Sequence, residues 1–123
     1  MIIDTNAIPE VVREHAYGGA GRLLCRVLLS KEQWRNEITL CNRLRLDPGS
    51  EIGPHAHTGD FELYYILSGT GLVDDNGEPK AVKAGDLIYT AGGATHSLLN
   101  NGAEVLELLA IVISENAGTP AEA

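Results

Sequence analysis

Short runs of apolar residues alternate with turns rich in glycine and polar residues along most of the chain. In residues 38–46 the large apolar side chains share one face of an extended backbone, and they are Ile38, Leu40, Leu44 and Leu46. Residues 61–68 are rich in aromatic and large aliphatic side chains, and residues 105–113 form a long apolar run. Residues 75–77, Asp-Asn-Gly, predict a hairpin turn between two further strands. The pattern therefore predicts a succession of strands joined by short turns.

We expect about eight or nine strands, because the apolar runs recur every 8–12 residues or so, as in an all-β sandwich or small barrel. No segment shows the period of a long amphipathic helix, although residues 31–37 allow either a short helical turn or a polar loop. Residues 1–16 follow no clear period. Glycine-rich residues 17–21 precede an apolar run rather than a helix, so we expect an ordinary loop there. Residues 114–123 lack large apolar side chains and are expected to fray.

The chain has 123 residues, 44% of them hydrophobic, which predicts a single domain that folds without a disulfide or structural metal. Its formal net charge of −8 disfavours nucleic acid and anionic membrane surfaces as partners. No apolar run is long enough for a membrane-spanning helix, and the first residues do not resemble a signal peptide. We therefore expect a cytoplasmic protein in which Cys25 and Cys41 are reduced thiols.

Three of the four histidines, His55, His57 and His96, lie in predicted strand regions punctuated by glycine. His55 and His57 are two residues apart, so on a strand both rings point to the same face. A turn after His57 could bring the carboxylate of Glu62 back beside them. Three neutral imidazoles and one carboxylate suit a divalent metal such as iron, manganese, nickel, cobalt, copper or zinc. A surface pair or a hydrogen-bonded core pair is the alternative for the two neighbouring histidines.

The spacing of these residues resembles the two motifs of the cupin superfamily. Gly49, His55, His57, Glu62 and Gly69 match the first motif, and Gly85, Gly93, His96 and Asn100 match the second. Ala84 and Ala91 stand where proline is common, which changes the turns but removes no ligand. The resemblance implies a single cupin domain over residues 1–123, a double-stranded β-helix or jelly-roll barrel with an extra N-terminal segment and a motif-bearing core at residues 38–113. It also implies one divalent transition metal per chain, held by His55, His57, Glu62 and His96.

Strand parity indicates which other side chains could share the barrel interior with this ligand set. If Glu62 points inward, the side chains of Tyr64, Ile66 and Ser68 point inward as well. Tyr64 is then a candidate to bind a substrate, to donate a proton or to hydrogen-bond a ligand side chain. If the apolar face of residues 38–46 is the inner one, Asn42 lines the pocket. Arg43 occupies the opposite face, and it is the second candidate because cupin pockets often use arginine to hold carboxylates.

The resemblance leaves the activity open. An octahedral metal with four protein ligands keeps two positions for a small oxygenated ligand, such as a carboxylic or sugar acid. We therefore expect a small metalloenzyme: a dioxygenase, isomerase, lyase or decarboxylase. The alternative is a non-enzymatic module that binds or senses a metabolite through the metal. A purely structural cupin is disfavoured, because all four ligand positions are filled.

Two of the predicted strands carry apolar side chains on both faces. In residues 61–68 the side chains that lie opposite Glu62 and Tyr64 are Phe61, Leu63, Tyr65 and Leu67, and residues 105–113 show the same property. A lone small barrel would present polar residues on its outer face, so these faces need a cover. We expect the N-terminal 30 residues or so to cover one of them and a two-fold partner to cover the other, which gives a homodimer.

Overall fold

The computed structural model describes residues 1–34 and 37–115. These residues form ten strands: β1 (Val11–Glu14), β2 (Arg22–Val27), β3 (Ile38–Leu46), β4 (Glu51–Ala56), β5 (Asp60–Ser68), β6 (Thr70–Asp75), β7 (Glu78–Lys83), β8 (Leu87–Thr90), β9 (Thr95–Leu99) and β10 (Leu106–Ser114). The helical elements of the described residues are three short 3-10 turns, η1 (Thr5–Ala7), η2 (Ala16–Gly18) and η3 (Lys31–Gln33). The prediction of an all-β fold is therefore confirmed.

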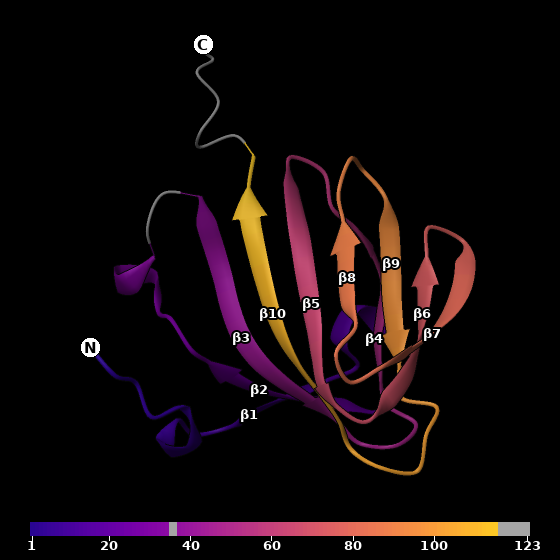
Figure 1. Cartoon of the computed structure of the whole chain (residues 1–123), viewed down its shortest axis with the longest axis horizontal. Coiled ribbons are helices and arrows are strands. Elements are labelled where there is room, and N and C mark those ends of the chain that lie inside the picture. The colour runs from indigo at the N-terminus through magenta and orange to yellow at the C-terminus, as the bar shows by residue number, and fades with distance from the viewer. Residues whose placement is uncertain (35–36, 116–123) are drawn as a thin grey trace.

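The strands form two antiparallel sheets. The six-stranded sheet has the order β1-β2-β3-β10-β5-β8, and the four-stranded sheet has the order β4-β9-β6-β7. Figure 1 shows β3, β10, β5 and β8 side by side, with β4 of the other sheet behind them. From β3 to β10, strands that follow one another along the chain change sheet at every connection except β6–β7, as in a jelly-roll barrel. The strands that carry His55 and His96, β4 and β9, pair with each other in the four-stranded sheet.

The core lies between the two sheets and follows the alternation of the strands. Along β10 the buried side chains are Leu106, Leu108, Ala110 and Val112, and the residues between them are partly exposed. Leu44 and Leu46 of β3 are buried against the same core, as the apolar face of residues 38–46 predicted. Because one face of each central strand is buried, a slip of one residue in the pairing would expose the core, so the register is strongly specified.

The structure departs from the expected elements at the N-terminus and at the C-terminal end of β10. Residues 11–14 form β1, which brings the strands to ten rather than eight or nine; all its residues are exposed, so it has no burial period to detect. Residues 17–21 continue η2 into a loop, and residues 31–33 form η3, while residues 35–36 lie outside the described part. Ser114 belongs to β10 rather than to a frayed tail, and residues 116–123 also lie outside the described part.

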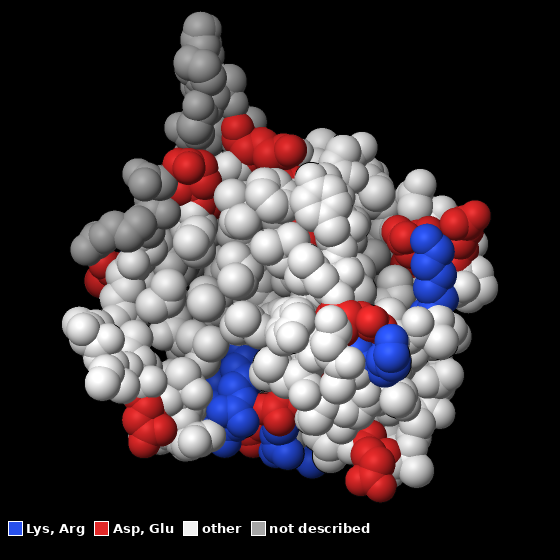
Figure 2. Space-filling view, viewed as in Figure 1, with Lys and Arg blue, Asp and Glu red and all other residues white. Residues whose placement is uncertain are grey.

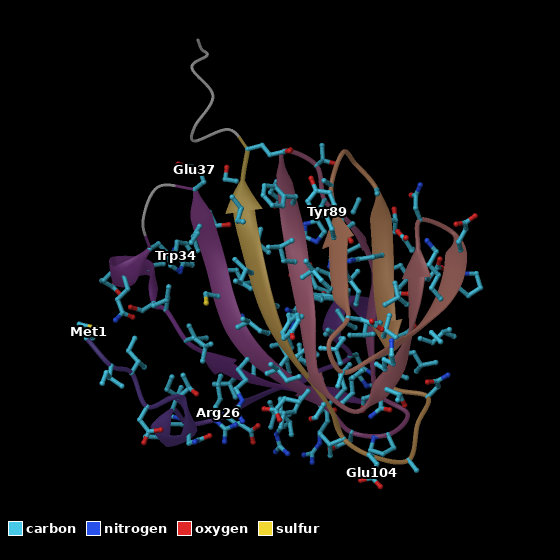
Figure 3. The ribbon with its side chains drawn as sticks, in the orientation of Figure 1. Met1, Arg26, Trp34, Glu37, Tyr89 and Glu104 are labelled. Atoms are coloured by element: carbon cyan, nitrogen blue, oxygen red, sulfur yellow. The ribbon has the colours of Figure 1, made fainter. Side chains whose placement is uncertain are left out.

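Two further features of the described residues concern the predicted environment of the chain. No helix among them is long and apolar enough to cross a membrane. Cys25 and Cys41 are both free thiols. Figure 3 shows Trp34 beside the start of β3, where its indole Nε1–H donates a hydrogen bond to the carbonyl of Leu29 at 3.2 Å, so this side chain packs against its own loop.

Candidate metal centre

The atoms of four side chains that could ligate a metal meet at one place on the inner wall of the barrel. Oε1 of Glu62 lies 2.7 Å from Nε2 of His57, 3.0 Å from Nε2 of His96 and 3.5 Å from Nε2 of His55. The Nε2 atoms of His55 and His96 are 2.9 Å apart. Atoms that each lie about 2.0–2.2 Å from one ion, at right angles, are separated by roughly 3 Å. The group formed by His55, His57, Glu62 and His96 could therefore hold a metal ion.

The pairing of strands and one tight turn bring the four side chains together. His55 on β4 lies directly opposite His96 on β9. Gly59 adopts a φ of +78°, a conformation that glycine tolerates without strain, so the chain turns sharply between His57 and Glu62. The backbone of His57 is fixed by hydrogen bonds with the β8–β9 loop, in which its N–H donates to Ala94 and its carbonyl accepts from Gly93. Residues 39 positions apart in the sequence thus become neighbours at the site.

The second ring nitrogen of each histidine is engaged by a neighbouring group. Nδ1–H of His55 donates to the carbonyl of Gly53 at 2.8 Å, and Nδ1–H of His57 donates to the carboxylate of Asp60 at 2.8 Å. Nδ1 of His96 lies 2.7 Å from the hydroxyl of Thr90. A carbonyl and a carboxylate can only accept, so the first two rings carry their proton on Nδ1 and present a lone pair at Nε2. Such outer partners fix both tautomer and orientation in metal sites.

One buried atom of this cluster shows that the residues fit a metal. Nε2 of His57 is buried and has no hydrogen-bond partner among the described residues. A buried polar atom without a partner is costly, and in native proteins it is rare. The lone pair of this nitrogen faces the carboxylate of Glu62 and two further imidazoles. Without a proton between them, the nitrogen and the carboxylate oxygen repel each other. A cation between the four ligand atoms would satisfy the orphaned nitrogen and remove that repulsion.

The electrostatics of the cluster keep its ligands in the form that binds metal. Burial raises the pKa of Glu62, but the histidine rings that surround its carboxylate outweigh this effect and lower the pKa to about 2. Burial also lowers the pKa of His96, although the carboxylate of Glu62 opposes the shift. At neutral pH the carboxylate is therefore ionised and the His96 ring is neutral, which is the state that a metal ligand requires.

We predict that the chain loses bound metal as the pH falls below the titration range of histidine. Protons compete with the metal for Nε2, and Glu62, with a pKa of about 2, stays ionised throughout. Since the pKa of His96 lies below 6.5, its lone pair stays available at neutral pH and is lost on further acidification. Dialysis of metal-loaded protein at stepped pH, followed by elemental analysis, should show full retention near pH 7 and loss by about pH 4–5. Retention that does not change down to about pH 3 would contradict histidine ligation.

A small cavity of about 80 Å³ opens beside the ligand cluster. His55 and Glu62 form part of its wall, and Tyr64 and Asn42 lie beside them. The ring of Tyr64 stacks on His96 with centroids 4.8 Å apart, and the residue is 3% exposed. Burial and the neighbouring Glu62 raise the pKa of Tyr64 well above its usual value, so its hydroxyl keeps its proton. The cavity is far smaller than the roughly 300–1,000 Å³ of pockets for drug-sized ligands, so it suits a small molecule.

Of the three residues predicted to line the pocket, the structure brings Tyr64 and Asn42 to the cavity and places Arg43 elsewhere. Asn42 and Arg43 are consecutive on β3, so they point to opposite faces of the sheet. The guanidinium of Arg43 lies on the outer face, where it pairs with Glu107 and donates to Asn6. The prediction for Arg43 is therefore corrected: the inner face of β3 is the apolar one, and Arg43 cannot share it.

The cavity residues that the sequence did not predict include Arg13 on β1 and Tyr17 in η2. The ring of Tyr17 stacks on His55 with centroids 4.0 Å apart and planes 15° apart. Arg13 and Tyr17 belong to residues 1–21, which show no strand period, so parity could not orient them. The glycines of residues 17–21 were the available signal of a close backbone contact, which the structure shows between Gly19 and β4. A glycine-rich loop alone does not indicate which side chain it positions.

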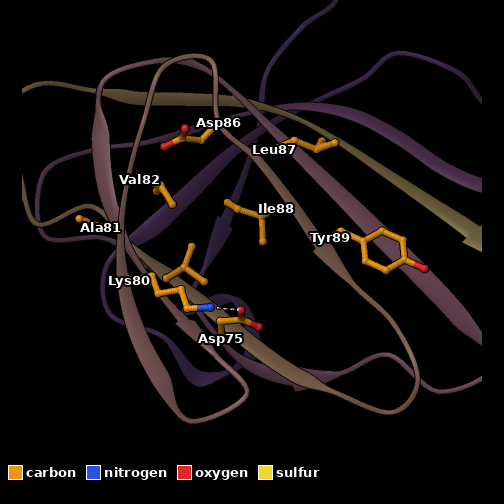
Figure 4. Close-up of a pocket in the computed structure, with 9 residues that line it drawn as sticks. Asp75, Lys80, Ala81, Val82, Asp86, Leu87, Ile88 and Tyr89 are labelled. Carbon is orange, nitrogen blue, oxygen red and sulfur yellow. Dashed lines mark hydrogen bonds and ion pairs between the residues drawn. The ribbon is translucent and has the colours of Figure 1, made fainter.

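A second, open cavity of about 310 Å³ lies where the edge strands β7 and β8 of the two sheets part. Figure 4 shows Asp75, Lys80 and Asp86 around it, together with Tyr89. The ammonium of Lys80 pairs with Asp75 at 3.0 Å, so the charges at this cavity already have partners. None of the four candidate metal ligands lines it.

The fold agrees with comparisons to known proteins. The sequence profile of the cupin domain matches residues 42–112, and the chain belongs to this family. It is 42% identical over 113 residues to the oxalate-binding protein of Thermotoga maritima, with 92% of this chain and 93% of that protein covered.

Solved structures give the same result. The crystal structure of a predicted oxalate decarboxylase from Thermotoga maritima superposes with a TM-score of 0.90 at 41% identity, covering 93% of this chain and 99% of that one. A polyketide cyclase from Streptomyces resistomycificus superposes with a TM-score of 0.75 at 15% identity, covering 97% of this chain and 82% of that one, and this likeness shows the fold alone. The predicted small bacterial cupin is therefore confirmed.

Proposed function

We propose that this cupin binds one divalent transition metal per chain through His55, His57, Glu62 and His96, and with it a small carboxylate of the oxalate class. The observation that carries the proposal is the convergence of three Nε2 atoms and one carboxylate oxygen, all within 4.8 Å of one another, at the wall of a small cavity. A metal bound there would supply Lewis acidity and open coordination positions for oxygen donors. Iron, manganese, nickel, cobalt, copper and zinc all suit this ligand set.

The shape of the site and the comparisons together support a small carboxylate as the ligand. The cavity of about 80 Å³ is lined by both polar and apolar side chains, and Asn42 and Tyr64 offer hydrogen-bond donors close to Glu62. The relative of 42% identity is named an oxalate-binding protein, and the likeness extends over nearly the whole of both chains. The cytoplasmic location that the sequence predicts stays part of this proposal.

The test is a calorimetric titration in two stages. First, Mn²⁺ is titrated into metal-free protein, and we expect one binding site per chain. Second, oxalate is titrated into the Mn²⁺-loaded protein and into the metal-free protein. Binding of oxalate only in the presence of metal supports the proposal, whereas equal binding with and without metal, or none in either, contradicts it.

A small metalloenzyme remains the second candidate, and Tyr64 is the observation that favours it. A buried hydroxyl that keeps its proton, beside the carboxylate of Glu62, is a group that could donate a proton to a bound substrate. Decarboxylation of oxalate releases CO₂ and places a proton on the remaining carbon, which gives formate. Incubation of Mn²⁺-loaded protein with oxalate, with formate measured over time, separates the two candidates: formate production identifies an enzyme, and oxalate bound without formate identifies a binding module.

We further propose a homodimer that buries the outer face of β5 and β8. The exposed side chains of this face include Tyr65, Leu67, Leu87 and Tyr89, which are 44%, 44%, 59% and 61% exposed. In Figure 2 the middle of the molecule, where β10, β5 and β8 lie in Figure 1, is almost free of charged residues. An apolar face of this kind on a soluble domain marks an interface.

The N-terminal segment covers a different part of the outer surface. Arg26 of β2 donates to the carbonyl of Ile8, and Arg45 of β3 pairs with Glu10, so residues 5–10 lie over β2 and β3. The face of β5 and β8 is therefore left for a partner. Light scattering coupled to gel filtration should give twice the monomer mass, and Tyr89→Glu should convert the species to a monomer. A wild-type chain that is a monodisperse monomer would contradict this assembly.

A further inference from the structure

Three side chains are stacked in series at the mouth of the cavity beside the ligand cluster. The ring of Tyr17 lies parallel to the ring of His55, with centroids 4.0 Å apart. The guanidinium carbon of Arg13 also lies over the ring of Tyr17, at 4.7 Å from the ring centroid. Arg13 and Tyr17 both line the cavity. The stack therefore links a candidate metal ligand to a cation that comes from a different sheet.

The loop that carries Tyr17 is fixed by close backbone packing against β4. A Cβ at Gly53 would lie 2.2 Å from the carbonyl oxygen of Tyr17, and a Cβ at Gly19 would lie 2.3 Å from the carbonyl oxygen of Glu51. Glycine at both positions is therefore required for the loop to sit this close to β4. Tyr17 itself has a φ of +51°, a left-handed conformation that is unfavourable for a tyrosine. The surrounding contacts hold the strained residue in place, as is common where a side chain has a specific task.

Arg13 differs in its surroundings from the other arginines that the structure describes. Arg22, Arg26, Arg43 and Arg45 each form an ion pair with a carboxylate. Among the described residues, no carboxylate pairs with Arg13, whose contact is the ring of Tyr17. It is also the only cationic side chain in the described wall of this cavity.

We propose that Arg13, positioned by Tyr17, recognises the second negative charge of the ligand, so that the site selects dicarboxylates over monocarboxylates. This inference rests on the proposed function of the site. A dicarboxylate has two anionic groups, and a single metal ion with one carboxylate ligand does not neutralise both of them together. A guanidinium presents its N–H groups at its edge, which stays free when its face is stacked on a ring, and such N–H groups bind carboxylate oxygens in pairs.

The test compares the affinity of Mn²⁺-loaded variants for oxalate and for acetate by calorimetry. Arg13→Gln removes the charge and is expected to weaken oxalate binding by about 10- to 100-fold, because hydrogen bonds between charged groups are the strong ones. The same variant should change acetate binding by less than about threefold, since acetate has no second carboxylate. Arg22→Gln is the matched control: it removes an arginine from the neighbouring strand that does not line the cavity, and it should change oxalate binding by less than about twofold.

Tyr17 is tested as a positioning residue by a pair of variants. Tyr17→Phe keeps the ring that contacts Arg13 and His55 and should keep the preference for oxalate over acetate. Tyr17→Leu removes the stack and should reduce that preference toward the value of Arg13→Gln.

Three results would overturn the inference, and each is distinguishable from failure of the proposed function. Equal oxalate affinity in wild type and Arg13→Gln would show that Arg13 does not contribute to recognition of the ligand. Parallel loss of oxalate and acetate affinity in Arg13→Gln would show a general effect without selection. Weaker Mn²⁺ binding in Arg13→Gln, measured before either acid is added, would show that Arg13 acts on the metal site instead. If wild type binds Mn²⁺ but neither acid, the proposed ligand class fails and the inference fails with it.

Discussion

Replacement of His57 by alanine is expected to abolish stoichiometric metal binding and leave the fold intact. The variant removes the one buried nitrogen of the cluster that has no other partner in the described part of the chain. Loss of a partner that only orients a ligand already costs about 10- to 100-fold in metal affinity, so loss of a ligand should cost more than about 100-fold. Elemental analysis after dialysis should then find almost no metal, while the far-ultraviolet circular dichroism spectrum stays that of the wild type. Stoichiometric metal in the variant would contradict the assignment.

A matched pair of carboxylate variants provides the control for charge. Glu62→Gln replaces a 4% exposed carboxylate inside the cluster, and Glu104→Gln replaces an exposed one in the loop before β10. Figure 3 shows Glu104 at the opposite end of the molecule from Glu37, and Glu104 is not a member of the cluster. Both variants change the net charge by the same amount. We expect Glu62→Gln to lose metal and Glu104→Gln to retain it; loss in both would indicate a general electrostatic effect rather than ligation.

Replacement of Leu108 by alanine is expected to have the largest effect on stability. Leu108 is fully buried on β10, which lies between β3 and β5. Truncation of such a leucine leaves a cavity and lowers the free energy of unfolding by about 2–5 kcal/mol. Urea denaturation of the metal-free protein measures this effect. A loss below about 1 kcal/mol would show that the site collapses around the smaller side chain and that Leu108 is not central to the core.

Val27→Ala serves as the control for Leu108→Ala, because Val27 lies at the end of β2 in the same sheet and is 46% exposed. We expect it to change the free energy of unfolding by about 0.5 kcal/mol or less. Together with His57→Ala, these variants separate two properties of the molecule. The hydrophobic core supplies the stability of the barrel, and the polar cluster supplies its affinity for metal.

The alternation of side chains predicted the interior of the barrel well wherever strands are regular. Glu62, Tyr64 and Ile66 point inward together, as parity requires, and all three are buried. The prediction was wrong for Ser68, which is exposed, because the pairing of β5 with β10 shifts register between Glu107 and Leu108. A β-bulge of this kind leaves no mark in the hydrophobic pattern, so parity cannot be carried across it.

The candidate ligands could be located from the sequence because their spacing reflects strand geometry. The prediction for His55 and His57 required only that their segment be extended. The prediction for Glu62 required one tight turn, which Gly59 provides. Arg13 and Tyr17 could not be located in the same way. They reach the cavity through a loop whose position depends on backbone packing between Gly19 and β4, a tertiary contact without a local periodic signal.

Anomalous X-ray diffraction from crystals of Mn²⁺-loaded protein would locate the metal directly. Ligation by the four clustered residues predicts one strong anomalous peak per chain, about 2.0–2.3 Å from Nε2 of His55, His57 and His96 and from a carboxylate oxygen of Glu62. The orphaned nitrogen of His57 would then be a ligand. The absence of a peak between these four residues, in crystals grown with the metal in excess, would contradict metal binding at this cluster.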